Sequence, residues 1–114
     1  MEVTPKQIVY YETLEGRVPY ENWYSKIKDV RLRLAVDKRL ERMESGNYGD
    51  CESVGEGVLE LRFKAFGVRI YFAEIGGIIV LLLCAGDMAS QKNDIAKAKK
   101  YWAEYNSRVE EVKL

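Results

Sequence analysis

The chain has 114 residues, of which 47% are apolar and 32% are charged, so it is expected to form one folded domain over residues 1–114 and not a disordered chain. Lys and Arg together number 18, as do Asp and Glu, which gives a net charge of zero and weakens the case for tight binding to free nucleic acid. The absence of histidine excludes every Ser-His and Cys-His catalytic pair.

The first half of the chain is expected to contain one strand and two helices. Residues 8–13 are rich in Val, Ile and Tyr and predict a strand. Pro19 suits the first turn of a helix over residues 20–28. A second apolar stripe at helical spacing follows, made of Leu32, Val36, Leu40 and Met43. Asp29 either caps a break between the two helices or lies in one continuous helix, and residues 45–47 end the second helix.

The second half predicts three strands and a final helix. Residues 58–64 and 68–74 alternate between apolar and polar, whereas residues 78–84 are apolar throughout, as in a central strand buried on both faces. A Gly76-Gly77 pair predicts a hairpin turn before that strand. Asp87 or Ser90 suits the cap of the last helix, whose apolar stripe includes Ala98 and Trp102. This order favours an α+β fold with a mostly antiparallel sheet, a helical pair on one face and a C-terminal helix.

The cysteines, the N-terminus and the apolar runs bear on localisation. Cys51 and Cys84 lack metal-ligand spacing and are expected to be free thiols, so no metal or cofactor is predicted. Glu2, Thr4 and Lys6 do not resemble the start of a signal peptide. The longest apolar run, residues 78–85, is too short to cross a membrane. We therefore expect a cytoplasmic protein without a membrane partner.

Basic and aromatic side chains alternate outward on two of the predicted strands. Arg62 and Lys64 share one strand, and Arg69 and Tyr71 share the next, so that in an antiparallel pair they become neighbours. Arginines suit phosphate oxygens, Lys64 crowded by two arginines suits a general base, and Tyr71 suits a proton donor or a stacking platform. The alternative is a solvated strand face with a half-buried Tyr71.

Gln91 and Lys92 begin the last helix beside this predicted surface and are candidates for RNA binding. Metal-free RNA cleavage requires an aligned 2′-OH, a proton acceptor, positive charge on the phosphorane and a proton donor to the leaving oxygen. The four strand residues Arg62, Lys64, Arg69 and Tyr71 are therefore the candidate catalytic set, and no metal is required.

Three segments resemble the RelE/ParE superfamily of bacterial toxins, in particular its HigB-like addiction module killer group. They are residues 46–62 with their Glu-Leu-Arg, residues 67–72 with Gly-Val-Arg-Ile-Tyr-Phe, and residues 81–95 with Ala-Gly-Asp followed by Ser-Gln and Asp-Ile. The resemblance covers roughly residues 39–98. By position, the resemblance implies that Arg62 and Arg69 are site residues. It also places Asp87, Gln91 and Asp94 in or beside the last helix. Asp87 and Asp94 also suit purely structural roles.

This resemblance implies a RelE/ParE-like fold and a toxin of a type II toxin–antitoxin module. Its partners would be a cognate antitoxin, in HigB-like systems often a helix-turn-helix protein, and the ribosome with mRNA, because the RelE branch is a ribosome-dependent mRNA endonuclease. Relatives often carry Gly-Pro-Gly-Tyr where this chain has residues 65–68, and lysine where it has Met88, for which Lys92 is a candidate substitute. Two alternatives remain, a ParE-like gyrase inhibitor and a catalytically decayed protein that only binds its antitoxin.

Overall fold

Five strands and three helices make up the part of the chain described by this computed structural model, residues 5–113. In chain order they are β1 (Gln7–Tyr10), α1 (Pro19–Ser25), α2 (Val30–Glu44), β2 (Cys51–Gly55), β3 (Val58–Phe63), a 3-10 turn (Lys64–Phe66), β4 (Val68–Ile75), β5 (Ile79–Asp87) and α3 (Gln91–Lys113). Glu2 and Thr4, on which the expectation about a signal peptide rests, lie outside the described residues.

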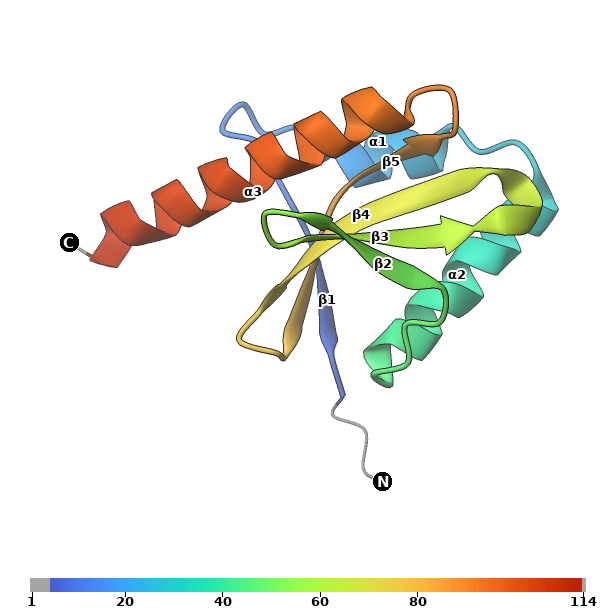
Figure 1. Cartoon of the computed structure of the whole chain (residues 1–114), viewed down its shortest axis with the longest axis horizontal. Helices are drawn as coiled ribbons and strands as arrows, with labels where there is room; N and C mark the ends of the chain where they lie inside the picture. The colour runs from blue at the N-terminus through green and yellow to red at the C-terminus, as the bar shows by residue number, and fades with distance from the viewer. Residues whose placement is uncertain (1–4, 114) are drawn as a thin grey trace.

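All five strands form one sheet in the order β1-β5-β4-β3-β2 (Figure 1). β2, β3, β4 and β5 pair antiparallel in sequence order, while β1 pairs with β5 in parallel. The predicted α+β class with a mostly antiparallel sheet is therefore confirmed.

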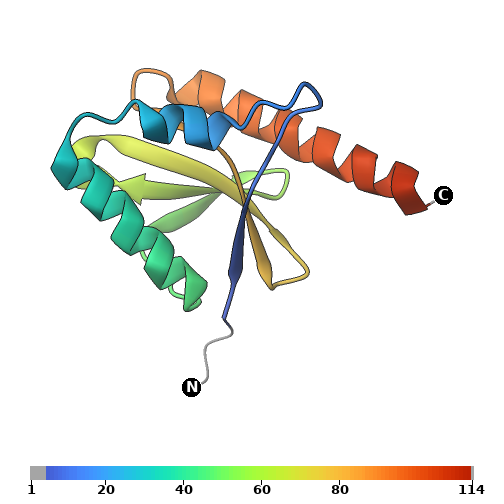
Figure 2. The ribbon, with the colours of Figure 1, turned by 180° about the vertical axis from the view of Figure 1, so that it is seen from behind.

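Helices cover both faces of this sheet (Figures 1 and 2). On one face, side chains of α1 and α2 such as Tyr20 and Val36 pack with Ile70 and Leu82. On the other face, α3 packs against the alternate strand residues, with Ala98 among the fully buried side chains. The prediction of a helical pair on one face is confirmed, and the C-terminal helix covers part of the opposite face.

The central position of β5 follows from its composition. Val80 and Leu82 are buried on the face of α1 and α2, whereas Leu81 and Leu83 are buried on the face of α3. An unbroken apolar run suits a strand with helices on both sides. The strand continues to Asp87, three residues beyond the predicted end, and it carries the chain to the start of α3.

Asp29 separates α1 from α2, which settles the alternative left open by the sequence. It has extended backbone angles, and its Oδ1 accepts a hydrogen bond of 2.9 Å from the backbone N–H of Arg31. This contact satisfies one of the backbone donors at the start of a helix. At the other end of α2, Gly46 has a φ of 89°, a left-handed conformation that glycine adopts without steric cost.

The edge strand β2 was not among the predicted strands. Its sequence Cys-Glu-Ser-Val-Gly has two polar residues in five, and no residue in it is fully buried. An edge strand packs on one side only, so it needs no long apolar run. β2 nevertheless matters for the site, because it brings Glu52 opposite Glu60 in the neighbouring strand.

Candidate functional site

The site lies where β3 and β4 face the beginning of α3. Pairing of the two strands places Arg62 opposite Arg69 and Glu60 opposite Tyr71. Alternate residues of a strand point to the same side, so these four side chains share the face that α3 partly covers. The structure therefore brings together three of the four predicted catalytic residues, and it adds Glu60.

Glu60 is the centre of this cluster, and its side chain is fully buried. It accepts hydrogen bonds from Arg62 Nε at 2.8 Å, from the Tyr71 hydroxyl at 2.9 Å and from Gln91 Nε2 at 3.0 Å. Arg69 Nε lies 3.5 Å from Glu60 Oε2, which makes an ion pair. One carboxylate thus fixes side chains from two strands and a helix.

These contacts determine the protonation state of the cluster. Burial alone would raise the pKa of Glu60, but hydrogen bonds from Arg62, Gln91 and Tyr71 and the charge of Arg69 outweigh it and lower that pKa. Burial and the hydrogen bond to Glu60 raise the pKa of the Tyr71 phenol. Glu60 is therefore ionised and Tyr71 protonated near neutral pH.

The two arginines differ in how completely they are paired. Arg62 forms ion pairs with Glu60 and with Glu52, and its side chain is 28% exposed. The Arg69 side chain is only 16% exposed, and within residues 5–113 its buried Nε has no hydrogen-bond partner. This Nε is too buried for a ligand to reach and faces Glu60. The terminal amino groups of Arg69 donate no hydrogen bond within residues 5–113, so they are the groups that a ligand in the neighbouring pocket can contact.

Lys64 departs from the prediction of a lysine crowded by two arginines. β3 ends at Phe63, and Lys64 begins a 3-10 turn closed by Gly67 with a φ of 64°. The Lys64 side chain is 78% exposed, and its Nζ lies 3.6 Å from Asp50 Oδ2. Because the strand stops one residue earlier, Lys64 pairs with Asp50, and its role as a general base remains a prediction.

Lys64 nevertheless reaches the same small pocket as the two arginines. This pocket has a volume of about 90 Å³, and Arg62, Lys64 and Arg69 line it together with Met88. We call it the cation pocket. Met88 is 62% exposed.

The two residues predicted for RNA binding have different environments. Gln91 is the first residue of α3, and its side-chain amide is committed to Glu60. Lys92 is exposed and does not line the cation pocket. The idea that Lys92 replaces the cation missing at Met88 therefore lacks geometric support.

Asp87 and Asp94 organise the connection into α3. Asp87 Oδ1 accepts a hydrogen bond from the backbone N–H of Ser90 at 3.2 Å, and Asp94 Oδ2 accepts one from the Ser90 hydroxyl at 2.5 Å. A Cβ atom added to Gly86 would lie 1.9 Å from Asp94 Oδ2. The structural alternative for both aspartates is therefore the one that the geometry supports.

The described part of the chain contains neither a disulfide nor a cluster of side chains that could hold a metal ion. Cys51 and Cys84 are free thiols, and burial raises the pKa of Cys84 to about 12. Among residues 5–113, no group of three or more Cys, Asp or Glu side chains is placed to hold a metal ion. None of the described helices has the length and apolar character needed to cross a membrane.

Comparison with known proteins gives one informative relationship. No protein-family model matches the chain. An uncharacterized protein of Haemophilus influenzae is 40% identical over 87 residues, which is 75% of this chain and 88% of that protein. The chain belongs to the same family as this Haemophilus influenzae protein. The relationship brings no activity with it, so the chemistry must be inferred from the site.

In this member of the family, positive and negative charges balance around the cation pocket. Arg62, Arg69 and Lys64 face three carboxylates, of which Glu60 is buried whereas Glu52 and Asp50 are exposed. Glu60 contacts both arginines from its buried position, and guanidinium groups held in this way suit phosphate binding.

Glu60 is a residue of the candidate site that the sequence interpretation did not include. In the structure it pairs with Arg62, which also pairs with Glu52. A signal was present: Glu60 occupies an outward position two residues before Arg62, on the same strand face. A carboxylate there is expected to neutralise the arginines beside it.

Proposed function

We propose that this chain is the toxin of a type II toxin–antitoxin module, with a RelE/ParE-like fold, and that it cuts mRNA on the ribosome. The observation that supports this most directly is Arg69, which is held against Glu60 by an ion pair and lines the cation pocket beside Arg62 and Lys64. The order of strands and helices and the resemblance of residues 39–98 to the HigB-like group add further support.

The proposed roles follow from exposure and pairing. Arg69 and Arg62 bind the non-bridging oxygens of the scissile phosphate, because guanidinium groups match their geometry. Lys64, at the exposed rim of the cation pocket, neutralises the negative charge that develops on the leaving 5′-oxygen. Tyr71 and Gln91 are positioning residues, because both hydrogen bonds are directed at Glu60 and Tyr71 is fully buried.

In the proposed reaction the 2′-oxygen of the RNA attacks the adjacent phosphorus, and the bond from phosphorus to the 5′-oxygen breaks. The products are a 2′,3′-cyclic phosphate and a 5′-hydroxyl, and solvent water accepts the proton of the 2′-OH and supplies one to the leaving 5′-oxygen. Neither the always charged arginines nor protonated Tyr71 suits a proton acceptor. The enzyme's contribution is therefore alignment and phosphorane stabilisation, each a large effect in itself.

The ribosome and an antitoxin complete this proposal. With a net charge of zero, the protein has little general attraction for free RNA. A ribosome that presents the message supplies the positioning energy that the chain lacks. The cognate antitoxin, of the helix-turn-helix type in many HigB-like modules, then protects the cytoplasm in which the toxin is made.

Induction of the chain alone in bacterial cells, followed by primer extension on an abundant message, tests the proposal. We expect growth arrest with discrete cuts for the wild type. Arg69→Ala should lose about 100- to 1,000-fold in cleavage rate, by analogy with loss of one oxyanion donor. Lys38→Ala, a change at an exposed position of α2, is the matched control. Arrest without cuts, together with inhibited DNA supercoiling, would instead favour a gyrase inhibitor.

One observation favours a second candidate function. In this alternative the chain is a catalytically inactive protein that binds an antitoxin without cutting RNA. Arg62 is held between Glu60 and Glu52, and Tyr71 has no exposure, so two of the four predicted catalytic groups are not free in this state. Normal growth of cells that express the folded chain without any antitoxin would support this alternative.

A further inference from the structure

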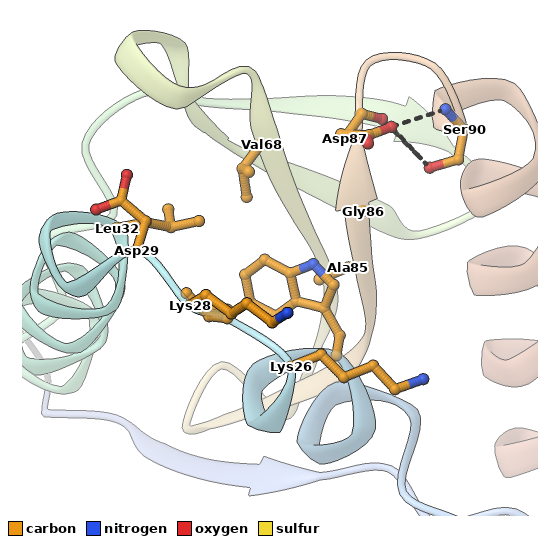
Figure 3. A pocket seen from close by; sticks show the side chains of 11 residues that line it. Lys26, Lys28, Asp29, Leu32, Val68, Ala85, Gly86, Asp87 and Ser90 are labelled. Atoms are coloured by element: carbon orange, nitrogen blue, oxygen red, sulfur yellow. Dashed lines mark hydrogen bonds between the residues drawn. The ribbon is translucent and has the colours of Figure 1, made fainter.

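A second and larger pocket lies between the junction of α1 and α2 and the end of β5 (Figure 3). Its volume is about 440 Å³, within the usual range of roughly 300–1,000 Å³ for small-ligand sites. Trp23, Lys26 and Lys28 line it from the helical side, and Val68, Asp87 and Ser90 line it from the sheet side. We call it the junction pocket.

The junction pocket carries two available positive charges. Lys26 and Lys28 are both exposed, and within residues 5–113 neither forms an ion pair or a side-chain hydrogen bond. Figure 3 shows both on the α1 side, across the pocket from Asp87 and Ser90. These two lysines can therefore receive an anionic ligand without giving up another partner.

The two carboxylates that line the junction pocket are already engaged. Asp29 Oδ1 accepts from the backbone N–H of Arg31 at the start of α2. Asp87 Oδ1 accepts from the backbone N–H of Ser90 before α3. The backbone N–H groups at the starts of α2 and α3 thus partly neutralise the two aspartates, whereas the charges of the two lysines face solvent. The pocket offers an unpaired cationic side to a ligand.

Trp23 adds a flat apolar surface. It is half-buried and packs against the core of the α1 and α2 face, and it is the aromatic residue among those lining the pocket. An indole held in place by the core on one side is well suited to stack a nucleobase on the other. Lysines beside an aromatic platform are the usual combination for single-stranded nucleic acid.

The junction pocket adjoins the cation pocket. Val68 lines both, and Val68 pairs with Asp87, which precedes Met88 of the cation pocket. Both pockets therefore lie at the end of the sheet where β4 begins and β5 ends. The junction pocket opens on the face of α1 and α2, whereas Arg62 and Arg69 lie on the face of α3. A single RNA strand with a phosphate between the two arginines would therefore reach the junction pocket by passing around this end of the sheet beside Val68.

We propose that the junction pocket binds one unpaired RNA nucleotide next to the bond that is cut, with its base on Trp23 and its phosphate near Lys26 and Lys28. This inference rests on the proposed function for the identity of the ligand. It goes further in assigning a binding site to residues of α1 and the α1–α2 connection, outside the predicted catalytic set.

The two tryptophans of the chain provide an internal control for the test. Trp102 lies on α3 beside Gly57, at the opposite end of β3 from the cation pocket, and stacks on Tyr105 with 5.8 Å between ring centroids. The probe is a single-stranded RNA hexamer that is fully 2′-O-methylated and so cannot be cut. In low salt, we expect it to shift the ¹⁵N–¹H indole resonance of Trp23 but not that of Trp102.

Charge variants then test the two lysines. Lys26→Gln with Lys28→Gln should weaken hexamer binding and reduce the dependence of log affinity on log salt by about one for each phosphate that is no longer neutralised. Lys38 is also exposed but lies on α2 and outside this pocket, so Lys38→Gln should change neither the affinity for the hexamer nor its salt dependence. An unmoved Trp23 resonance at millimolar hexamer, or identical behaviour of both lysine variants, would overturn the inference.

Further outcomes separate the inference from the proposed function. Ribosome-dependent cleavage with an unmoved Trp23 would leave the endonuclease in place and remove the nucleotide site. Hexamer binding at Trp23 without cleavage would keep the site and remove the endonuclease. An acidic hexapeptide that shifts Trp23 as strongly as the RNA would show that the pocket recognises negative charge alone, which would contradict a nucleotide site.

Discussion

Glu60 is the residue on which the site depends most. Replacement by Gln keeps its size but removes the charge that pairs with Arg62 and Arg69. Because hydrogen bonds to charged groups contribute about 1.5–3 kcal/mol, we expect Glu60→Gln to lower the free energy of unfolding by roughly that amount. Urea denaturation measures this change in the free energy of unfolding. Glu52→Gln, at an exposed position, should change stability by less than about 1 kcal/mol. Equal effects would contradict the central role of Glu60.

Glu60 should also give stability a specific dependence on pH. Its pKa is lowered in the folded protein, so its stabilising contribution is complete above the ordinary glutamate pKa of about 4.3 and is lost as the pH falls through the folded value. Urea denaturation of wild type and Glu60→Gln from pH 7 to pH 3 should show the difference between them shrinking below about pH 4.3. A difference that stays constant would mean that the pKa of Glu60 is the same in the folded and unfolded states, which would contradict its lowering by the arginines.

If Arg62 binds the phosphate as proposed, Glu52 competes with the substrate for it. In the free protein its exposed carboxylate pairs with the guanidinium that should bind phosphate. Since an exposed ion pair contributes up to about 1 kcal/mol, Glu52→Gln should raise cleavage at limiting ribosome concentration by no more than about fivefold. Initial rates of message cleavage in a translation extract measure this. A decrease would show instead that Glu52 helps to hold Arg62 in its active position.

Part of this site could be predicted at the level of single residues. Alternation along β3 and β4 was enough to place Arg62, Arg69 and Tyr71 on one face. It did not show that Tyr71 would be buried against Glu60, because that depends on the path of α3 over the sheet. It also misplaced Lys64, since a charged residue after an alternating run looks the same whether the strand continues or turns.

Among the elements, the connection from β5 to α3 is tightly packed at Gly86. Gly86 is buried and leaves no room for a Cβ beside Asp94 and Ser90. We expect Gly86→Ala to reduce the free energy of unfolding by about 1–3 kcal/mol, the usual effect of overpacking. Adding Asp94→Ala removes the clashing carboxylate, so the double variant should lose less than the sum of the single variants. Additive losses in thermal or urea denaturation would contradict this packing.

The elements with the strongest sequence signals were predicted best. The apolar run of β5, the Gly76-Gly77 hairpin and the apolar stripe of α2 each match an element of the structure. β2 was missed because an exposed edge strand with mixed composition has little periodicity. The first strand was predicted to reach Thr13 but ends at Tyr10, where Tyr11 continues toward α3 and donates a hydrogen bond to Glu104.

At the scale of the whole molecule, the zero net charge limits what the protein can do alone. The three cations of the cation pocket are paired with the carboxylates of Glu60, Glu52 and Asp50, so this pocket has no excess positive charge to hold free RNA at physiological salt. We therefore expect purified protein to leave naked message intact at physiological salt. Cutting of naked RNA at the same rate as ribosome-bound message would contradict the proposed dependence on the ribosome.

The most direct measurement is cleavage of a defined message in a purified translation system by the wild type and by Arg69→Ala, with the fold of the variant checked by its thermal unfolding. We predict discrete cuts on ribosome-bound message for the wild type and an approximately 100- to 1,000-fold slower reaction for a folded Arg69→Ala. Intact message with folded wild-type protein bound to the ribosome would contradict the endonuclease proposal.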